Sequence, residues 1–184
     1  GLRNVATASH QAGAGLMVLA PRGAAPDAPV PELRAVYAAL RAVSGMVDTS
    51  LLLPPLFGLR AHLLGPWIRA AEAGRALRVR RPDQELRPLW VQDAVTLALS
   101  GLERPLGRLS AAGPETWALG ALADKVCQAS GARRAWLPGL SSPRPLDLRL
   151  LAGQLEGPDP WPEVLPPRRT VDQFLAQVLA PGPD

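Results

Sequence analysis

Residue types that mark several common functional classes are scarce in this chain of 184 residues. Its one cysteine, Cys127, excludes a disulfide within the chain, and its place on an apolar helical face predicts a small buried hydrophobe. The two isolated histidines, His10 and His62, do not form a metal site with one distant cysteine. His62 is the better functional candidate, yet we expect it to be exposed to solvent. No apolar run approaches the roughly 20 residues of a membrane-spanning helix, so we expect no transmembrane segment.

Lysine is almost absent. Lys125 is the only lysine among 20 basic residues, which leaves 19 arginines, and the net charge is a modest +4. The densest basic run, Arg75–Arg81, contains no aromatic residue and matches no nucleic-acid-binding motif. We therefore expect a solvated loop there and no nucleic-acid partner. Contact with a phosphate or an acidic partner is the alternative for this run.

Strand and helix patterns alternate between Leu86 and Pro138, which is typical of α/β proteins. Short apolar runs predict strands at Leu86–Val91, Leu109–Ala112 and Ala135–Pro138. Between them, two stretches have apolar residues at the i, i+3, i+4 spacing of a helical face. The first face comprises Val91, Ala94, Val95, Ala98, Leu99 and Leu102. The second comprises Leu119, Leu122, Ala123, Val126 and Cys127. Gly131 follows the second face, at the position where glycine commonly ends a helix.

The flanking regions continue the same pattern. The continuously apolar run Leu16–Ala20 predicts a strand buried on both faces of a parallel sheet, and Thr49–Leu53 is the second predicted buried strand. The remaining predicted elements are helices, one of which opens with the capping box Thr170-x-x-Gln173. They lie at Leu2–Ala12, Pro31–Val43, about Leu64–Ala71, Leu146–Leu155 and from Thr170 onward. The predicted fold class is therefore α/β.

Three stretches resemble the extended and atypical branches of the short-chain dehydrogenase/reductase family. The longest is "RPLWVQDAVTLALSGLERPLGRLSAAGPETWALGALADKVCQASGARRAWLP", in which the "V-x-D" helix start and the "G-P-E" turn follow the order of the family's C-terminal part. "GLRN" resembles the family's "G-T-x-N" helix start, and "DTSLLLPPLFG" resembles its sixth strand and the loop after it. The layout is similar to NAD-dependent epimerase/dehydratase-like proteins, NmrA-like proteins and an accessory subunit of respiratory complex I.

The resemblance implies the later half of a Rossmann-type parallel sheet plus a small, mostly helical C-terminal subdomain. Residues 1–60 would be the second half of an NAD(P)-binding domain, and residues 61–184 would complete the sheet and form a substrate-type subdomain. The family's Gly-rich phosphate-binding turn would precede Gly1, which is not a methionine, so we expect a fragment of a longer protein. We also expect a protein partner or the missing N-terminal half to cover the exposed sheet edge.

The catalytic groups of the family have no counterparts at the matching positions. The catalytic Ser/Thr is replaced by Ala20-Pro21, and the arginine of the family's "R-P" is replaced by Leu53. No Tyr-x-x-x-Lys occurs, although Tyr37 with Arg41 gives Tyr-x-x-x-Arg. This pair would lie in the middle of a helix, away from the cofactor, so Tyr37 is only a weak catalytic candidate. Proline and alanine cannot transfer a proton to a substrate oxygen.

One loop remains as a candidate for cofactor binding by resemblance. It comprises Pro54, Pro55, Leu56, Phe57 and Gly58. In the family this loop passes near the nicotinamide, whereas the alternative interpretation is a rigid turn between a strand and a helix. NAD or NADP binding is expected only if an upstream Gly-rich half is present.

Two functions from different classes follow from the resemblance. The first is a non-catalytic structural, sensor or assembly protein, a pseudoenzyme that has lost the Ser, Tyr and Lys groups. The alternative is an active NAD(P)-dependent oxidoreductase or epimerase with displaced catalytic residues.

Asp93 is expected to cap and tether a helix start. The expected location is cytoplasmic, or an organelle matrix for a respiratory accessory subunit.

Overall fold

The computed structural model of the chain describes residues 1–21, 31–58, 63–79, 82–132, 134–136, 165 and 167–179. The predicted helix at Leu146–Leu155, together with His62, lies outside these residues. The helices are α1 (Leu2–Gln11), α2 (Pro31–Val43), α3 (Gly65–Glu72), α4 (Val91–Glu103), α5 (Leu119–Ser130) and α7 (Val171–Val178). The strands are β1 (Met17–Pro21), β2 (Thr49–Leu53), β3 (Leu56–Phe57), β4 (Leu77–Val79), β5 (Glu85–Leu86), β6 (Leu89–Trp90), β7 (Gly107–Ser110), β8 (Trp117–Ala118) and β9 (Arg134–Trp136).

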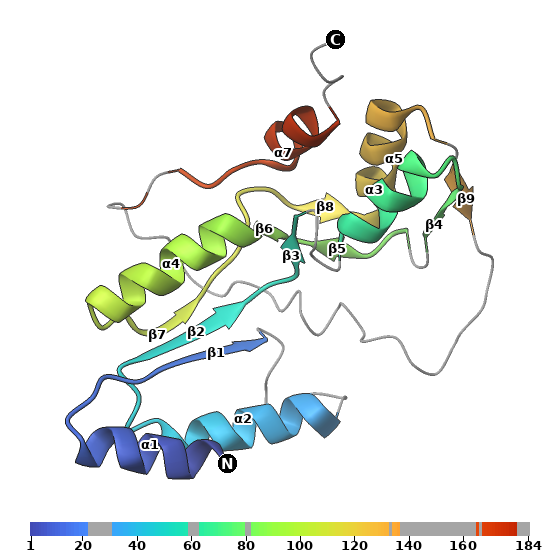
Figure 1. The fold of residues 1–184 in the computed structure, drawn as a ribbon. Coiled ribbons are helices and arrows are strands. Elements are labelled where there is room, and N and C mark those ends of the chain that lie inside the picture. The colour runs from blue at the N-terminus through green and yellow to red at the C-terminus, as the bar shows by residue number, and fades with distance from the viewer. Residues whose placement is uncertain are drawn as a thin grey trace.

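The main sheet consists of three parallel strands in the order β1-β2-β7, as the continuous apolar runs predict. Helices α1 and α2 lie on one side of it and α4 lies on the other (Figure 1). Thr49 and Leu51 of β2 face α4, since Thr49 bonds to Gly101 and Leu51 packs in the α4 cluster. The intervening Ser50 and Leu52 therefore face α2. This is a three-layer α/β arrangement.

A second group of elements packs beside the sheet around its own apolar cluster. Helices α3, α5 and α7 enclose it, with short strand pairs β4-β9, β5-β8 and β3-β6 beneath them (Figure 1). Phe57 and Phe174 meet edge-to-face in this cluster, with ring centroids 5.4 Å apart. The predicted small, mostly helical C-terminal subdomain is confirmed, although it also contains these strand pairs.

Two helix termini match their sequence signals. Gly131 has the left-handed conformation, with φ of 67°, at the end of α5. Thr170 and Gln173 form the predicted capping box, since each side chain accepts a hydrogen bond from the backbone N–H of the other. Both short-range signals therefore act as expected.

The prediction of one strand over Leu86–Val91 is wrong. The segment divides into β5, which pairs antiparallel with β8, and β6, which pairs parallel with β3. Pro88 separates them, because proline has no N–H to donate to a strand partner. Val91 already belongs to α4. The last strand of the main sheet is β7 at Gly107–Ser110, two residues earlier than the predicted Leu109–Ala112.

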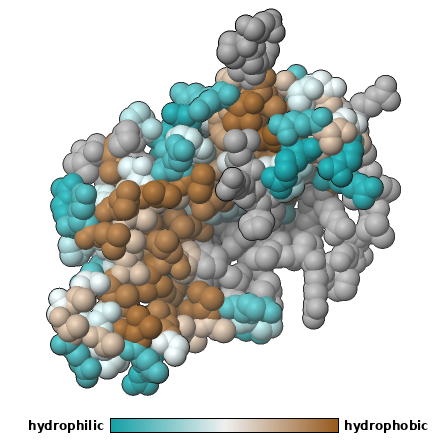
Figure 2. All heavy atoms as spheres, in the orientation of Figure 1, coloured by the Kyte–Doolittle hydropathy of each residue, from teal (hydrophilic) through white to brown (hydrophobic). Residues whose placement is uncertain are grey.

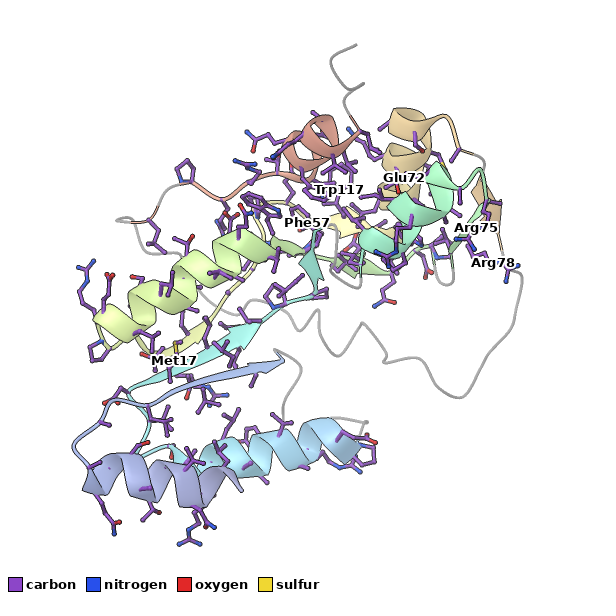
Figure 3. All side chains as sticks on the ribbon, viewed as in Figure 1. Met17, Phe57, Glu72, Arg75, Arg78 and Trp117 are labelled. Atoms are coloured by element: carbon purple, nitrogen blue, oxygen red, sulfur yellow. The ribbon has the colours of Figure 1, made fainter. Side chains whose placement is uncertain are left out.

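The interpretation of Arg75–Arg81 as a loop is also wrong for its centre. Leu77–Val79 forms β4, in which Leu77 and Val79 are buried and Arg78 is exposed. Arg75 and Arg78 lie at the outer rim of the subdomain in Figure 3. The alternation of apolar and basic residues follows the two-residue period of a strand.

Helix α4 buries only part of the predicted apolar face. Of its six residues, Ala94 is buried and Ala98 is half-buried. The other buried residues of α4 are Leu97, Ser100 and Gly101, which the prediction did not include. The other apolar residues of the face stay exposed: Val91, Val95, Leu99 and Leu102. The helix has more apolar surface than the described residues cover.

Candidate functional site

The carboxyl ends of β1, β2 and β7 meet at one edge of the main sheet. The parallel register places Pro21 beside Leu53 and places Leu52 beside Ser110. Open parallel sheets bind their ligands outside the carboxyl ends of the strands, because the loops there converge on one crevice. This edge is therefore the candidate functional site.

The strand ends at this edge offer little chemistry. The side chain of Ala20 is only 6% exposed and has no titratable group, and Pro21 has neither a hydroxyl nor an N–H. Leu53 is half-buried and apolar. Among the described residues that end these three strands, Ser110 is the only one with a hydroxyl group. Its register partner Leu52 faces α2, so Ser110 faces α2 as well.

The loop Pro54–Gly58 lies directly after β2 at this edge. Leu89 N donates to Pro55 O over 3.1 Å, and Phe57 is fully buried in the subdomain cluster. Figure 3 shows Phe57 between the main sheet and α7. Leu56 is half-buried, so it and Leu53 are the residues of this strand end that retain exposed surface.

The donor set at this loop can be compared with the parts of a dinucleotide. Pro54 and Pro55 have no N–H groups, so they cannot hold a pyrophosphate in the way that a Gly-rich turn does. Leu53 and Leu56 can form an apolar wall for one face of a nicotinamide ring. The residues of this loop therefore fit the nicotinamide end of a dinucleotide better than its pyrophosphate.

Tyr37 lies at a different place. It borders a cavity of about 360 Å³ between α2 and the strands β2 and β7, together with Arg41, Ser44 and Arg108. The strand residues that line it run from Gly107, the first residue of β7, to Leu52 near the end of β2, and none belongs to the loop Pro54–Gly58. The Arg41 guanidinium donates a hydrogen bond to the phenol oxygen of Tyr37, and this bond raises the pKa of Arg41. The structure does not bring Tyr37 together with the loop Pro54–Gly58.

Asp93 joins the start of α4 to the C-terminal segment. Its Oδ2 accepts a hydrogen bond of 2.7 Å from Arg169 N, which is 76 residues away in sequence. The Arg169 guanidinium lies 4.1 Å from the centre of the Trp90 ring. The expected capping role is wrong, because Trp90 is the N-cap residue of α4 and no side chain caps this end. Burial raises the pKa of Asp93, and the hydrogen bond and charge of Arg169 partly oppose that rise.

Glu115 forms a second link to the same segment. Its Oε2 accepts hydrogen bonds from Trp117 Nε1 at 3.1 Å and from Val171 N, the first residue of α7, at 3.4 Å. Arg168 contributes a third link by donating to Ala112 O over 2.8 Å. The "G-P-E" turn did not predict the contact between Glu115 and α7, since Val171 is 56 residues away in the sequence.

Close backbone packing explains why the "G-P-E" turn begins with a glycine, Gly113. A Cβ atom here would lie 1.7 Å from Pro88 O, and the nearest approach that real Cβ atoms make is about 3.0 Å. Gly113 N also donates to Arg87 O, and Arg87 Nε donates to Gly113 O, each over 3.1 Å. The turn therefore presses backbone against backbone between β7 and the β5–β6 segment, and only glycine fits.

The described ranges also lack two features that would indicate other functional classes. They contain no cluster of three or more His, Cys, Asp or Glu residues that could hold a metal ion. None of their helices is long and apolar enough to cross a membrane. Cys127 is half-buried on α5, so it is less buried than its sequence position predicts.

Comparison with known proteins identifies the fold and no particular relative. No protein-family model matches the chain. No curated protein matches it by sequence. Solved structures do match. With dTDP-glucose 4,6-dehydratase from Bacillus anthracis, a complex with NAD, the TM-score is 0.72 at 9% identity, over 97% of this chain and 65% of that one.

Two other structures are similar over less of the chain. UDP-glucose 4-epimerase from Thermotoga maritima, solved with UDP-glucose, matches with a TM-score of 0.62 at 13% identity, over 75% of this chain and 55% of that one. dTDP-4-dehydrorhamnose reductase from Bacillus anthracis, in complex with NADP, matches with a TM-score of 0.60 at 20% identity, over 76% and 56%. The chain thus spans between 55% and 65% of the length of these three proteins. It has the Rossmann-type α/β fold that these dehydratase, epimerase and reductase structures have.

Proposed function

We propose that the chain is the later part of an NAD(P)-binding Rossmann protein that holds the cofactor without catalysis, as a structural, sensor or assembly protein. The observation that carries this proposal is the composition of the carboxyl edge. The strand ends Ala20-Pro21 and Leu53 provide apolar contact, yet they have no group that can exchange a proton with a substrate oxygen. On this proposal, residues 1–60 belong to the cofactor domain and residues 61–184 complete the sheet and form the subdomain.

The cofactor assignment is supported by the solved structures that share the fold. Two of them were determined with NAD and NADP respectively, so the fold accommodates either dinucleotide in those proteins. In this chain the contact would come from Leu53 and Leu56. The nicotinamide would supply hydride chemistry when bound, whereas these side chains would only position its ring and exclude water.

On this proposal, the protein should bind NAD(P)H and should not catalyse a reaction of any carbonyl substrate. The experiment uses the product of the complete reading frame that contains these residues. It pairs a fluorescence titration with NADH and NADPH with a turnover assay on a panel of carbonyl and nucleotide-sugar substrates. The expected result is saturable binding with no turnover above buffer. Turnover that exceeds buffer by the 10² to 10⁴-fold typical of acid–base catalysis would refute the non-catalytic assignment.

An active enzyme with displaced groups is the second candidate, because Arg41 hydrogen-bonds to Tyr37 as a lysine would pair with a catalytic tyrosine. The place of Tyr37 in a cavity that no residue of the loop Pro54–Gly58 lines argues against this candidate. Tyr37→Phe removes only the phenol oxygen, so it should leave NADH binding and any measured rate unchanged. Activity that this single change abolishes would make Tyr37 the acid.

The contact with Leu56 has its own test. Leu56→Ala should weaken NADH binding by about 3- to 10-fold if Leu56 packs on the nicotinamide ring, since it removes apolar contact area. Leu40→Ala is the matched control, because Leu40 lines the Tyr37 cavity on the other face of the sheet. Equal affinities in the two variants would show that Pro54–Gly58 is only a rigid turn.

A further inference from the structure

The strand β1 is covered on one face of the sheet and uncovered on the other. Ala20, which faces α2, is 6% exposed, whereas Leu19, which points to the α4 side, is 51% exposed. The register partner of Leu19 is Leu51 on β2, which is fully buried beneath α4. Helix α4 therefore reaches over β2 and not over the outer half of β1.

The exposed apolar residues of α4 continue this uncovered surface. Val95, Leu99 and Leu102 are 52%, 56% and 63% exposed, and they lie on one side of the helix at a spacing of four and three residues. Gly101, one residue before Leu102, approaches the sulfur of Met17 on β1, which fixes this end of α4 near that strand. Figure 3 shows Met17 between α4 and the strands. We call Leu19, Val95, Leu99 and Leu102 the uncovered face.

These four residues belong to one continuous apolar surface. Figure 2 shows a brown area on the left of the view that runs from α4 over the strands below it. Isolated exposed leucines are ordinary, but contiguous apolar surface beside an unpaired strand edge marks a place where another element packs. Among the strands that the structure describes, β1 pairs only with β2, so an occupant could add a strand at its other edge and an apolar helix face against α4.

We propose that the uncovered face is the docking surface for a βα unit that precedes these residues in a longer polypeptide. A strand of that unit would pair with β1, and its helix would pack against Leu19 and Leu99. The lengths of the matched structures argue for this occupant, because this chain spans only 55% to 65% of them. The inference rests on the proposed function, since such a unit is also where a phosphate-binding turn would be found.

Thiol labelling tests the proposal at single residues. Cys127 is the only native cysteine, so Cys127→Ala gives a background in which one introduced thiol reports on one position. Leu99→Cys reports on the uncovered face. Ala176→Cys is the control, because Ala176 is exposed on α7, in the subdomain and away from β1 (Figure 1). Both are made in the 184-residue chain and in the product of the complete reading frame.

The expected result is a difference confined to position 99. In the complete product, its labelling should slow at least about 100-fold relative to the 184-residue chain, as expected when opening of a packed interface limits access. Position 176 should react at similar rates in both. Equal labelling of position 99 in both proteins would overturn the proposal.

Protection of position 99 in the 184-residue chain, with a dimer mass by light scattering, would also overturn it in favour of a second copy. Cofactor binding is measured separately by the NADH titration. Protection at position 99 without NADH binding would leave the docking surface standing while refuting the proposed function. NADH binding without protection at position 99 would refute the docking surface and leave the proposed function standing.

Discussion

Replacing Gly113 with alanine is the most informative single change, because the structure sets its outcome through backbone atoms. The new Cβ would lie 1.7 Å from Pro88 O and 2.6 Å from Pro88 C, against a practical minimum of about 3.0 Å. Neither atom belongs to a side chain that can rotate away. The β7 turn or the Arg87–Pro88 segment must therefore move by more than 1 Å.

The energetic consequence has two parts. Overpacking in a tightly fitted region typically costs about 1–3 kcal/mol. The displacement also strains the bonds from Gly113 N to Arg87 O and from Arg87 Nε to Gly113 O, each worth about 0.5–1.5 kcal/mol. We expect a loss of about 3–5 kcal/mol, which for a chain of this size lowers Tm by roughly 6–20 °C.

Thermal unfolding followed by circular dichroism measures this loss, and two other glycines provide matched controls. Gly45→Ala adds a methyl group with no atom within 4 Å and without a positive φ, so its Tm should stay within about 2 °C of the parent. Gly13→Ala also meets open space but has φ of 65°, so it should lose about 1 kcal/mol from backbone strain alone. If Gly113→Ala melts within the range of these two controls, the close contact with Pro88 is not a constraint in solution.

Two further substitutions test the polar contacts of the fold by thermal unfolding. Thr49 is fully buried, and its Oγ1 donates to Gly101 O and accepts from Leu106 N, so Thr49→Val should lose about 1–3 kcal/mol of stability. The control Thr96→Val removes an exposed hydroxyl that donates to Gln92 O and should change stability by less than about 0.5 kcal/mol. Equal losses in the two variants would refute the role of burial. Asp93→Ala removes the acceptor for Arg169 N and should lose about 1–2 kcal/mol, whereas Asp93→Asn retains an acceptor and should lose less; a larger loss in the asparagine variant would contradict the tether. Burial raises the pKa of Asp93 above its ordinary value of 3.8, so ionisation of this carboxyl destabilises the folded state as the pH rises from 3.8 through the raised pKa. Asp93→Asn should remove that decline from a profile of stability against pH. An unchanged slope would show that the pKa shift is absent.

Local sequence signals predicted the local structure well. Thr49–Leu53 is a strand at the predicted residues, and the capping box at Thr170 and the left-handed Gly131 have the expected geometry. These features depend on residues within one turn or one strand of each other. The short strands were harder to place, since a pair such as Leu89–Trp90 is defined by its partner β3 and not by its own periodicity.

Helix α4 shows that periodicity does not predict which apolar residues of a helix are buried. Its apolar residues cover more than half of the helix circumference, so the spacing alone does not say which of them meet the sheet. The structure selects Ala94 and Leu97, whereas Val95 and Leu99 remain outside. Likewise, the partner of Asp93 could not be predicted, because Arg169 lies in a segment that no local pattern connects to α4.

The polar residues near the carboxyl edge bear directly on whether chemistry can occur there. Asp93 is committed to Arg169 N, Glu115 to Trp117 and Val171, and Arg168 to Ala112 O. A carboxylate that holds a backbone N–H and is partly buried is a poor proton shuttle, since moving its proton would break the contact that anchors the C-terminal segment. These contacts hold the segment before α7 and its first residue in place, and of the strand ends beside them only Ser110 is polar. The described residues at this edge thus provide apolar surface and the hydrogen bonds that hold the C-terminal segment beside it. On the proposal above, groups that bind the cofactor phosphates would come from the βα unit that packs on the uncovered face beside β1.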